Sequence, residues 1–343
     1  MRILVHEFVS GGGLAGRDVP ASLVREGAAM LRALVTDLAA IRRHRIVATA
    51  DSRFPLEAPP GVDEVTLGPA SHAQLDALIA ASDAVWLVAP ETGGCLERLA
   101  ARVGRQGTLL LGPGPATIRR AADKGALPRL LARLGVACPA TRVLGPGRAW
   151  ADWKTAAGRL GYPVVVKPRR GAGCDGVCLA RDARELGRAV EVAREAGGRE
   201  SLVLQSYVGG VAASVSLLAD GQRAMALGVN AQSVRAARPF SYRGGTTPLD
   251  HPLAGRAVDV ALRVCEALPG LRGWVGVDLV LTGSEAVVIE VNPRLTTAYL
   301  GVRSAVASNV AALALAACAG TLPGSVAIRQ PVRFSALGRV AGR

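Results

Sequence analysis

The segment from Gly273 to Arg294 constrains the fold most, because it pairs two strand-forming runs across a short polar turn. Thr282 to Glu285 have the composition of that turn. If the turn centres near Ser284, Asp278 lies opposite Glu290, and directly opposed residues of a hairpin project from the same face, about 5 Å apart. Asn292 and Arg294 follow Glu290 at alternate positions, so they are expected on that face as well.

The two faces of this expected hairpin differ in chemistry. One face is apolar and is expected against a core, with Val277, Leu279, Leu281, Val287, Ile289 and Val291. The other face brings two carboxylates and one amide together, and facing carboxylates repel unless a cation joins them. Such oxygen ligands suit Mg²⁺, with water and substrate phosphates completing its coordination. The hairpin therefore predicts a Mg²⁺ or Mn²⁺ site at Asp278, Glu290 and Asn292, with an ordinary solvent-facing hairpin as the alternative.

A glycine-rich motif, YPVVVKPRRGAGCDGV, occupies residues 162–177. Its β-branched run ends at Lys167, and three glycines follow, at Gly171, Gly173 and Gly176. The strand-like run after it argues against a Rossmann turn, and a P-loop signature is absent. A glycine-rich flap between two strands can still lay backbone N–H groups over phosphates, with Lys167 supplying a point charge. A flexible surface hairpin is the alternative.

Two weaker signals surround this flap. Lys124 lies in AADKGALPRLL, near the start of an expected helix, where a surface lysine would be unremarkable in isolation. The run LVLQSYVGG (residues 202–210) ends in two glycines, and its backbone could form a hinge that contacts adenine, or it is a plain core strand. Lysine is scarce, with only Lys124, Lys154 and Lys167 among the 41 basic residues. That scarcity modestly favours a specific role for the lysines that remain.

The order of expected elements predicts an α/β fold. Strands at 2–5, 45–50, 84–88 and 108–111 alternate with helices at 22–40 and 73–80, which favours a parallel sheet covered on both faces. The remainder predicts helices from 115 and at 181–196, 255–267 and 302–319. It also predicts strands at 163–167, 177–180 and 201–208, and hairpins over 214–229 and 274–294.

Composition narrows the class of protein. The chain has 343 residues, is half hydrophobic and a fifth charged, and so is expected to be globular. No apolar run reaches the ~20 residues of a membrane helix, and the N-terminal MRILVHEF predicts a strand instead of a signal peptide. We therefore expect a cytoplasmic protein without a membrane partner. The six cysteines are expected as structural or free thiols, since no disulfide framework or zinc set is apparent.

The net charge of +14 would by itself suggest nucleic-acid binding. The basic residues are scattered, however, and aromatic residues make up only 3%, so base-stacking platforms would be scarce. Attraction of anionic small molecules such as ATP is the favoured interpretation, with no nucleic-acid partner.

Together the motifs resemble the ATP-grasp superfamily in order and in spacing. They are Lys124, Lys167 with its flap, a hinge at Gln205, Tyr207 and Val208, and the E-x-N-x-R sequence of Glu290, Asn292 and Arg294. The resemblance covers about residues 115–320 and implies an ATP-grasp fold. Its parts would be an N-terminal Rossmann-like pre-ATP-grasp domain (1–115), a small lid with the flap (116–204), a C-terminal antiparallel-sheet domain with the metal site (205–325) and a tail (326–343).

This resemblance implies an ATP-dependent ligase that joins a carboxylate to an amine through an acyl phosphate and releases ADP and phosphate. ATP would contact Lys124, Lys167, the three flap glycines and the hinge, while Mg²⁺ or Mn²⁺ binds the acidic hairpin. Arg294 and Lys167 are the implied catalytic residues. The implied substrate contacts are Arg243, Thr296, Thr297, Tyr299 and Arg303. No general base is evident.

Five segments are similar to the tyramine–L-glutamate ligases of methanofuran biosynthesis: HEFVSGGG (6–13), SVSLL (214–218), GVNAQ (228–232), YRGGTTP (242–248) and NPRLTTAYLGVR (292–303). This likeness implies the γ-carboxylate of L-glutamate and tyramine as substrates, and a homodimer is compatible with it. Related ligases often carry an acidic residue after the hinge, but this chain has none at Ser206 or between Val211 and Ala213, so backbone groups are expected to contact the ribose. The alternatives are a ligase for another amino acid and amine, a non-catalytic nucleotide-binding protein, and a nucleic-acid-binding protein.

Overall fold

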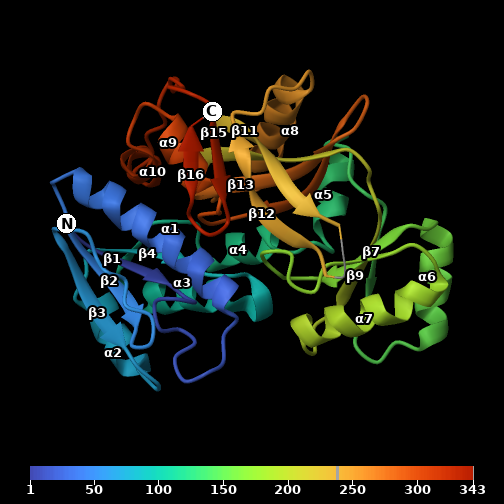
Figure 1. Ribbon diagram of the computed structural model, residues 1–343, viewed down its shortest axis with the longest axis horizontal. Helices are drawn as coiled ribbons and strands as arrows, with labels where there is room; N and C mark the ends of the chain where they lie inside the picture. Colours follow the sequence, from blue (N-terminus) through green and yellow to red (C-terminus); the bar gives the residue numbers. More distant parts are fainter. Residues whose placement is uncertain (237–238, 343) are drawn as a thin grey trace.

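The computed structural model describes residues 1–236 and 239–342, which form three sheets and the helices around them (Figure 1). The first sheet is parallel, with strand order β3-β2-β1-β4-β5. It confirms the parallel sheet predicted for the first 115 residues. Its strands are β1 (Arg2–Glu7), β2 (Arg45–Asp51), β3 (Val62–Leu67), β4 (Ala84–Val88) and β5 (Leu109–Leu110).

Helices cover both faces of this sheet, as its nearly continuous apolar strands require. Helix α1 (Ala21–Ala40) packs on one face, against residues such as Ile3 and Ile46. Helices α2 (His72–Ala80) and α3 (Cys95–Arg105) pack on the other, where Leu4 and Val85 lie. A single 3₁₀ turn, η1 (Thr92–Gly94), precedes α3. Neither β3 nor α3 was expected from the sequence.

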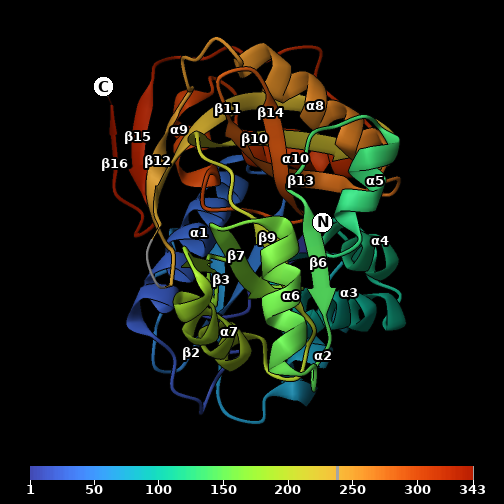
Figure 2. The ribbon, with the colours of Figure 1, turned by 90° about the vertical axis from the view of Figure 1, so that its right-hand side faces the viewer.

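The second sheet is the core of a small lid, which comes toward the viewer in Figure 2. Its strand order is β6-β9-β7-β8, and all the pairs are antiparallel. Two helices, α6 (Trp150–Leu160) and α7 (Ala183–Gly197), bury Trp153, Leu186 and Val190 against it. The strands are β6 (Thr141–Leu144), β7 (Val164–Pro168), β8 (Cys178–Ala180) and β9 (Leu202–Ser206), and α4 (Pro115–Ala121) and α5 (Leu127–Arg133) lead into the lid.

The third sheet is antiparallel, with strand order β14-β13-β10-β11-β12-β15-β16. Helix α8 (Ala254–Glu266) covers one face, and α9 (Tyr299–Ala305) and α10 (Val310–Cys318) join the core on the other. The helix expected over 302–319 is thus two helices, and the expected tail contributes two strands. The strands are β10 (Val211–Asp220), β11 (Ala224–Arg235), β12 (Ser241–Thr247), β13 (Arg272–Leu281), β14 (Ala286–Asn292), β15 (Val332–Ser335) and β16 (Val340–Gly342).

The β13–β14 hairpin has the predicted register at its polar end, where Asp278 pairs with Glu290. A β-bulge follows, because Leu279 pairs with Val288 and leaves Ile289 as the extra residue. The bulge reverses which residues of β14 face the core. The expectation was therefore wrong for Val287 and Ile289, since Val288 and Ala286 join the core with Val277, Leu279, Leu281 and Val291.

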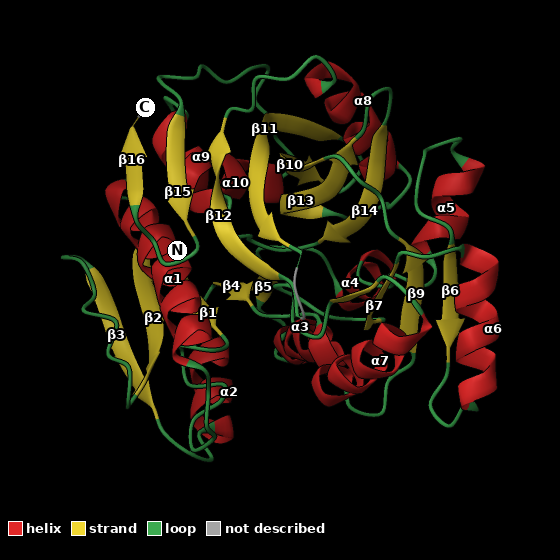
Figure 3. Ribbon diagram, turned by 45° about the vertical axis from the view of Figure 1, so that its right-hand side comes forward, coloured by secondary structure: helices red, strands yellow, loops and turns green. Residues whose placement is uncertain are grey.

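Helix α1 connects the first and third sheets, and Figure 3 shows it running between them. It contacts β1 and β2 on one side and α9 and α10 on the other. The apolar core around α1 accordingly includes residues of both units, such as Leu34, Tyr299 and Ala314. Among the described residues, none of the helices has the length and apolar character needed to cross a bilayer.

Candidate active site

Three adjoining cavities lie between the lid, the third sheet and the N-terminal unit. The hairpin cavity, of about 170 Å³, is lined by the acidic pair of Asp278 and Glu290, by Lys124 and Lys167, and by the end of β9. The junction cavity, of about 110 Å³, shares Cys174, Gln232, Asp278 and Glu290 with it. The α1 cavity, of about 390 Å³, shares Glu26, Gly173 and Arg294 with the junction cavity. These shared walls make one continuous site.

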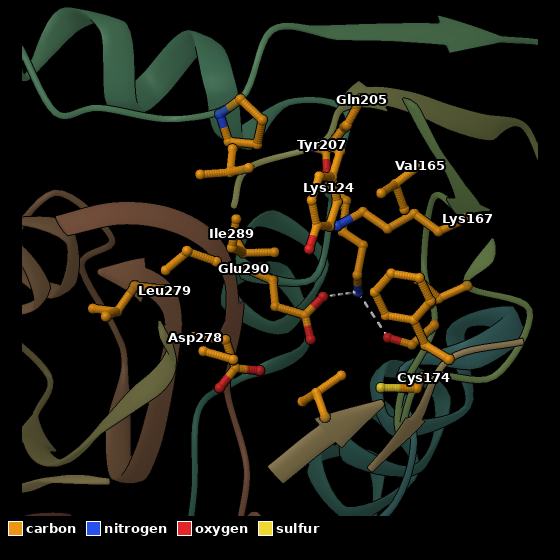
Figure 4. Close-up of a pocket in the computed structure, with 18 of the residues that line it drawn as sticks. Lys124, Val165, Lys167, Cys174, Gln205, Tyr207, Asp278, Leu279, Ile289 and Glu290 are labelled. Carbon is orange, nitrogen blue, oxygen red and sulfur yellow. Dashed lines mark hydrogen bonds and ion pairs between the residues drawn. The ribbon is translucent and has the colours of Figure 1, made fainter. Parts of the chain in front are cut away.

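The acidic pair forms the floor of this site, and Figure 4 shows Asp278 and Glu290 on neighbouring strands. Asn292 donates its amide N–H to Asp278 Oδ2 at 3.0 Å, and Gln232 donates to Asp278 Oδ1 at 2.9 Å. Lys124 Nζ lies 3.2 Å from Glu290 Oε2. Both acids are thus held by donors from two different strands and a loop, which fixes their orientation.

The electrostatics of the pair follow from burial and from the lysines. Burial and the facing Glu290 carboxylate raise the pKa of Asp278 to about 7. Burial alone would raise the pKa of Glu290, but the ammonium groups of Lys124 and Lys167 outweigh it and lower that pKa. Without a further cation, the pair therefore tends to keep one proton, on Asp278.

Lys124 lies in the turn between α4 and α5, and not within a helix as predicted. Asp123 fixes this turn by accepting from the backbone N–H groups of Gly125 and Ala126 and from the Arg169 guanidinium, at 2.7 and 2.6 Å. Lys124 Nζ also donates to the Gly171 carbonyl at 2.7 Å, as drawn in Figure 4. The lysine thus connects the flap to Glu290.

Lys167 lies near the end of β7, as predicted, with only 3% of its surface exposed. Burial lowers the pKa of Lys167 to about 8, against the opposing effect of the Glu290 carboxylate.

Of the flap glycines, Gly171 lines the hairpin cavity, and Gly173 lines the other two. Gly176 lines none of the three cavities; a Cβ there would lie 2.6 Å from the Cβ of Ala196, so this glycine allows close packing on α7.

The predicted hinge also reaches the hairpin cavity. Gln205, Tyr207 and Val208 line it where β9 ends. Apolar side chains form the opposite walls, among them Val165, Leu279 and Ile289. Ile289 reaches the cavity because it is the extra residue of the bulge. A narrow apolar slot beside a polar, lysine-lined end fits a flat base that carries a charged chain.

The junction cavity contains three of the predicted residues that follow the acidic pair. Arg294 pairs with Glu91 at 3.0 Å and also donates to the Leu295 carbonyl at 3.0 Å. Thr297 donates its hydroxyl to Glu26 of α1. Thr296 accepts from the Trp274 indole at 3.2 Å. The contacts of Arg294 with Glu91 and of Thr297 with Glu26 join the segment after β14 to the N-terminal unit.

Three predicted substrate residues lie away from these cavities. Tyr299 and Arg303 both bind the Asp37 carboxylate of α1, and Tyr299 is fully buried. Arg243 lines a fourth cavity of about 510 Å³ with Arg333 and Arg339, which adjoins the others only through Gln232. The structure therefore does not bring these three side chains to the acidic pair.

Sequence reasoning missed Gln232 and Glu26. Gln232 lies in the GVNAQ segment, and its position on β11, two strands from β13, follows only from the sheet order. Glu26 lies on α1, 271 residues before Thr297 in the chain, and no local pattern marks it. Both contacts are tertiary.

The donor set fits a hard divalent cation. Two partly buried carboxylates face each other beside the Asn292 amide, and their mutual repulsion would be relieved by positive charge. Within the described part of the chain, no group of three or more His, Cys, Asp and Glu side chains is arranged to hold a metal ion. A cation at Asp278, Glu290 and Asn292 would thus need oxygen ligands from phosphates or water, as Mg²⁺ usually does.

Comparison with known proteins places the chain in a family. Residues 121–298 match the ATP-grasp domain, and residues 44–118 match the pre ATP-grasp 3 domain. Among curated relatives, the tyramine–L-glutamate ligase of Methanocaldococcus jannaschii is 30% identical over 105 residues, which is 31% of this chain and 33% of that protein. The D-alanine–D-alanine ligase of Desulforudis audaxviator is 32% identical over 201 residues, covering 55% and 64% of the two chains.

These matches span less than two thirds of each curated relative. Among solved structures, the biotin carboxylase domain dimer of Hydrogenobacter thermophilus 2-oxoglutarate carboxylase, in complex with MgADP, ADP and bicarbonate, superposes with a TM-score of 0.74. It is 17% identical, and the match covers 97% of this chain and 73% of that one. Because the family model spans more than half of the chain, and the fold agrees, this protein belongs to the ATP-grasp family.

Proposed function

We propose that this protein is an ATP-dependent ligase that joins a carboxylate to an amine through an acyl phosphate and releases ADP and phosphate. One observation carries the proposal: two lysines, two carboxylates and a glycine-rich flap converge on one cavity whose far walls are apolar. This combination suits a nucleoside triphosphate, because the apolar walls can contact the base and the lysines and flap can contact the phosphates.

The chain's own residues have distinct proposed roles toward ATP. The apolar slot at Val165, Leu279 and Ile289 would hold the adenine, next to the backbone of the hinge. Lys124 and Lys167 would neutralise phosphate charge, and the flap N–H groups would cover the phosphates. Asp278, Glu290 and Asn292 would hold Mg²⁺, which supplies positive charge to the β- and γ-phosphates when it is bound.

The proposed chemistry depends on position and charge. A substrate carboxylate attacks the γ-phosphorus, ADP leaves, and the resulting acyl phosphate is then attacked by an amine. Arg294, at the border of the junction and α1 cavities, is our candidate for stabilising the transferring phosphoryl group. Thr296 and Thr297 are candidates for orienting the carboxylate substrate, since they line the junction cavity.

The narrower proposal is the γ-carboxylate of L-glutamate with tyramine, as in methanofuran biosynthesis. It is supported by the five similar segments and by the tyramine–L-glutamate ligases among the relatives. A ligase for another amino acid and amine is the rival, supported by the likeness to an L-amino acid ligase from Bacillus licheniformis. The dimeric neighbour motivates a further proposal, that the protein is a homodimer in solution.

The test is ADP release with Mg-ATP, L-glutamate and tyramine, with each omitted in turn. ADP that requires both substrates, together with an amide product found by mass spectrometry, would establish the narrow proposal. ADP release only with another acid and amine would support the ligase proposal and would contradict tyramine or L-glutamate as a substrate. Nucleotide binding without turnover across the twenty amino acids and a panel of amines would favour a non-catalytic nucleotide-binding protein.

A further inference from the structure

We propose that the α1 cavity binds the amine substrate, with its apolar body against Phe8, Leu23, Met30 and Val88, and that Glu26 accepts the proton released by the amine nitrogen. The inference rests on the proposed ligase function and adds the class of amine and the base. The hairpin carboxylates face lysines and the expected metal, and Asp175, the flap carboxylate, lines the hairpin and α1 cavities but not the junction cavity where the acidic pair meets Glu26.

The position of Glu26 suits this role. Its side chain lines both the junction cavity, where Asp278 and Glu290 lie, and the α1 cavity. Arg294 and Gly173 line both cavities too, so the carboxylate lies where a molecule in the α1 cavity would meet the acyl phosphate. The Thr297 hydroxyl donates to Glu26 Oε1 and so fixes the carboxylate toward this border.

The α1 cavity is the largest of the three adjoining cavities, and its walls are mostly apolar. Phe8 and Val88 come from the carboxyl ends of β1 and β4, and Leu23 and Met30 come from α1. A cavity of about 390 Å³ with such walls suits a compact apolar group. An amine with an aromatic or branched aliphatic body therefore fits better than ammonia or a strongly polar amine.

Asp175 lines the α1 cavity but not the junction cavity, and the two remaining carboxylates near this border are already bound. Glu7 also lines the α1 cavity, but it accepts from the Ser10 backbone N–H at 2.5 Å, the Ser10 hydroxyl at 2.7 Å and the Val9 N–H at 3.1 Å. Glu91 is paired with Arg294. Among the described residues, Glu26 accepts a hydrogen bond only from the neutral Thr297 hydroxyl, at Oε1, which leaves its second oxygen for an ammonium group.

The surroundings of Glu26 also favour a proton acceptor. Burial raises the pKa of Glu26, although the Thr297 hydrogen bond and the Arg294 charge oppose that rise. Arg294 comes from the segment after β14, Glu7 from β1 and Cys174 from the flap. The other charged or titratable groups on the walls of these two cavities are Arg17, Cys95, Arg98, Asp175, Tyr242, Asp278 and Glu290. A carboxylate with a raised pKa is a stronger base than one in water.

In the proposed step, the amine nitrogen gives one proton to Glu26 and one to the leaving phosphate. The bound ammonium group gives one proton to the Glu26 carboxylate and becomes a neutral amine. Its nitrogen forms a bond to the acyl carbon while the bond between that carbon and the phosphate oxygen breaks. Phosphate leaves, and the second nitrogen proton leaves with it, so the products are the amide, phosphate and protonated Glu26.

Hydroxylamine provides the decisive comparison, because it is mostly unprotonated at neutral pH and traps acyl phosphates as hydroxamates. With the carboxylate substrate found in the screen above, we expect Glu26→Gln to lower amide formation with tyramine about 100-fold. Hydroxamate formation should change less than about threefold. Glu57→Gln, an exposed glutamate paired with Arg32, is the matched control and should change neither rate.

A second variant tests the apolar part of the cavity. Leu23 is 38% exposed, so Leu23→Asp should fold, and it should raise the KM of tyramine about tenfold while leaving the KM of methylamine unchanged. If the KM of the carboxylate substrate rises instead, the cavity binds that substrate and not the amine, through Arg17 and Arg98 on its wall. That result would overturn the assignment.

The outcomes separate the two proposals. Loss of both tyramine and hydroxylamine reactions in Glu26→Gln would show that Glu26 acts before the amine step and would refute its role as proton acceptor. Equal amide formation in Glu26→Gln and the native protein would refute it as well. If the native protein forms neither product with any carboxylate, the ligase proposal fails and this inference fails with it.

Discussion

At the scale of single residues, the protonation of Asp278 is the main electrostatic feature of the acidic pair. The folded-state pKa of Asp278 is raised to about 7 from 3.8, so the carboxyl group binds its proton more tightly in the folded protein than in the unfolded chain. The corresponding stabilisation is complete below about pH 4 and is lost as the pH rises through about 7. Above that pH two like charges face each other unless a cation joins them.

This arrangement predicts a pH-dependent effect of Asp278→Asn. Asparagine keeps the size of the side chain but cannot ionise, so in EDTA the Tm of the variant minus that of the native protein should become more positive from pH 5 to pH 8. Thermal unfolding at both pH values measures the difference. A difference that stays constant would mean that Asp278 is ionised throughout this range, and the assignment of the shared proton would be wrong.

Lys167 gives a second residue-scale prediction. Its buried ammonium group lies in the same cavity as Lys124 and the acidic pair, so Lys167→Ala should weaken ATP binding about 10- to 100-fold, the usual effect of losing a charged hydrogen-bonding partner. Calorimetry with a non-hydrolysable ATP analogue measures it. Lys154→Ala removes an exposed lysine of α6 and is the control. Unchanged affinity in Lys167→Ala would exclude β7 and its flap from the nucleotide site.

At the scale of elements, the contact of α1 with α9 determines which predicted residues can reach a substrate. Asp37 accepts from the Tyr299 hydroxyl and the Arg303 guanidinium, and its backbone carbonyl accepts from Asn309 at 2.8 Å. Asp37→Ala should therefore destabilise the fold by about 1–3 kcal/mol, because it leaves a buried hydroxyl and a guanidinium without their acceptor. The KM of each substrate should stay within about twofold.

Thermal unfolding and steady-state kinetics test this prediction together. Glu57→Ala breaks an exposed ion pair with Arg32 and should change the free energy of unfolding by less than about 1 kcal/mol. An Asp37→Ala protein of native stability with a greatly raised substrate KM would instead assign Tyr299 and Arg303 to substrate binding, as the sequence resemblance implied.

At this scale, features that depend on local sequence pattern could be predicted, and features that depend on tertiary contacts could not. The pairing of Asp278 with Glu290 follows from turn position and alternation, which are local. The bulge at Ile289 breaks that alternation without any glycine or proline to mark it, so the face of Val287 and Ile289 was mispredicted. The two glycines of YRGGTTP are explained by tertiary packing. A Cβ at Gly244 or Gly245 would lie 2.1 Å from a carbonyl oxygen of a neighbouring strand, so these glycines allow close packing and do not indicate a mobile substrate loop.

At the scale of the whole molecule, the site exists only where the units meet. The lid provides Lys167 and the flap, the third sheet provides the acidic pair, and the first unit provides Glu26 and Glu91. The sequence motifs located the first two contributions because each is carried by a short segment. The contribution of α1 was missed because Glu26 and Thr297 meet only after all three units have packed.

A site built from separate units predicts that Mg-ATP stabilises the entire fold. At 100 times its Kd, a ligand that binds only the folded state adds about 2.7 kcal/mol, which corresponds to a rise in Tm of about 4 °C for a chain of this size. Differential scanning fluorimetry with Mg-ATP, ATP plus EDTA, and Mg²⁺ alone measures the effect. We expect the full rise only with Mg-ATP, no comparable rise in Asp278→Asn, and an unchanged rise in Lys154→Ala. An equal rise with ATP in EDTA would show that nucleotide binding does not require a cation at the acidic pair, and the metal assignment would have to be abandoned.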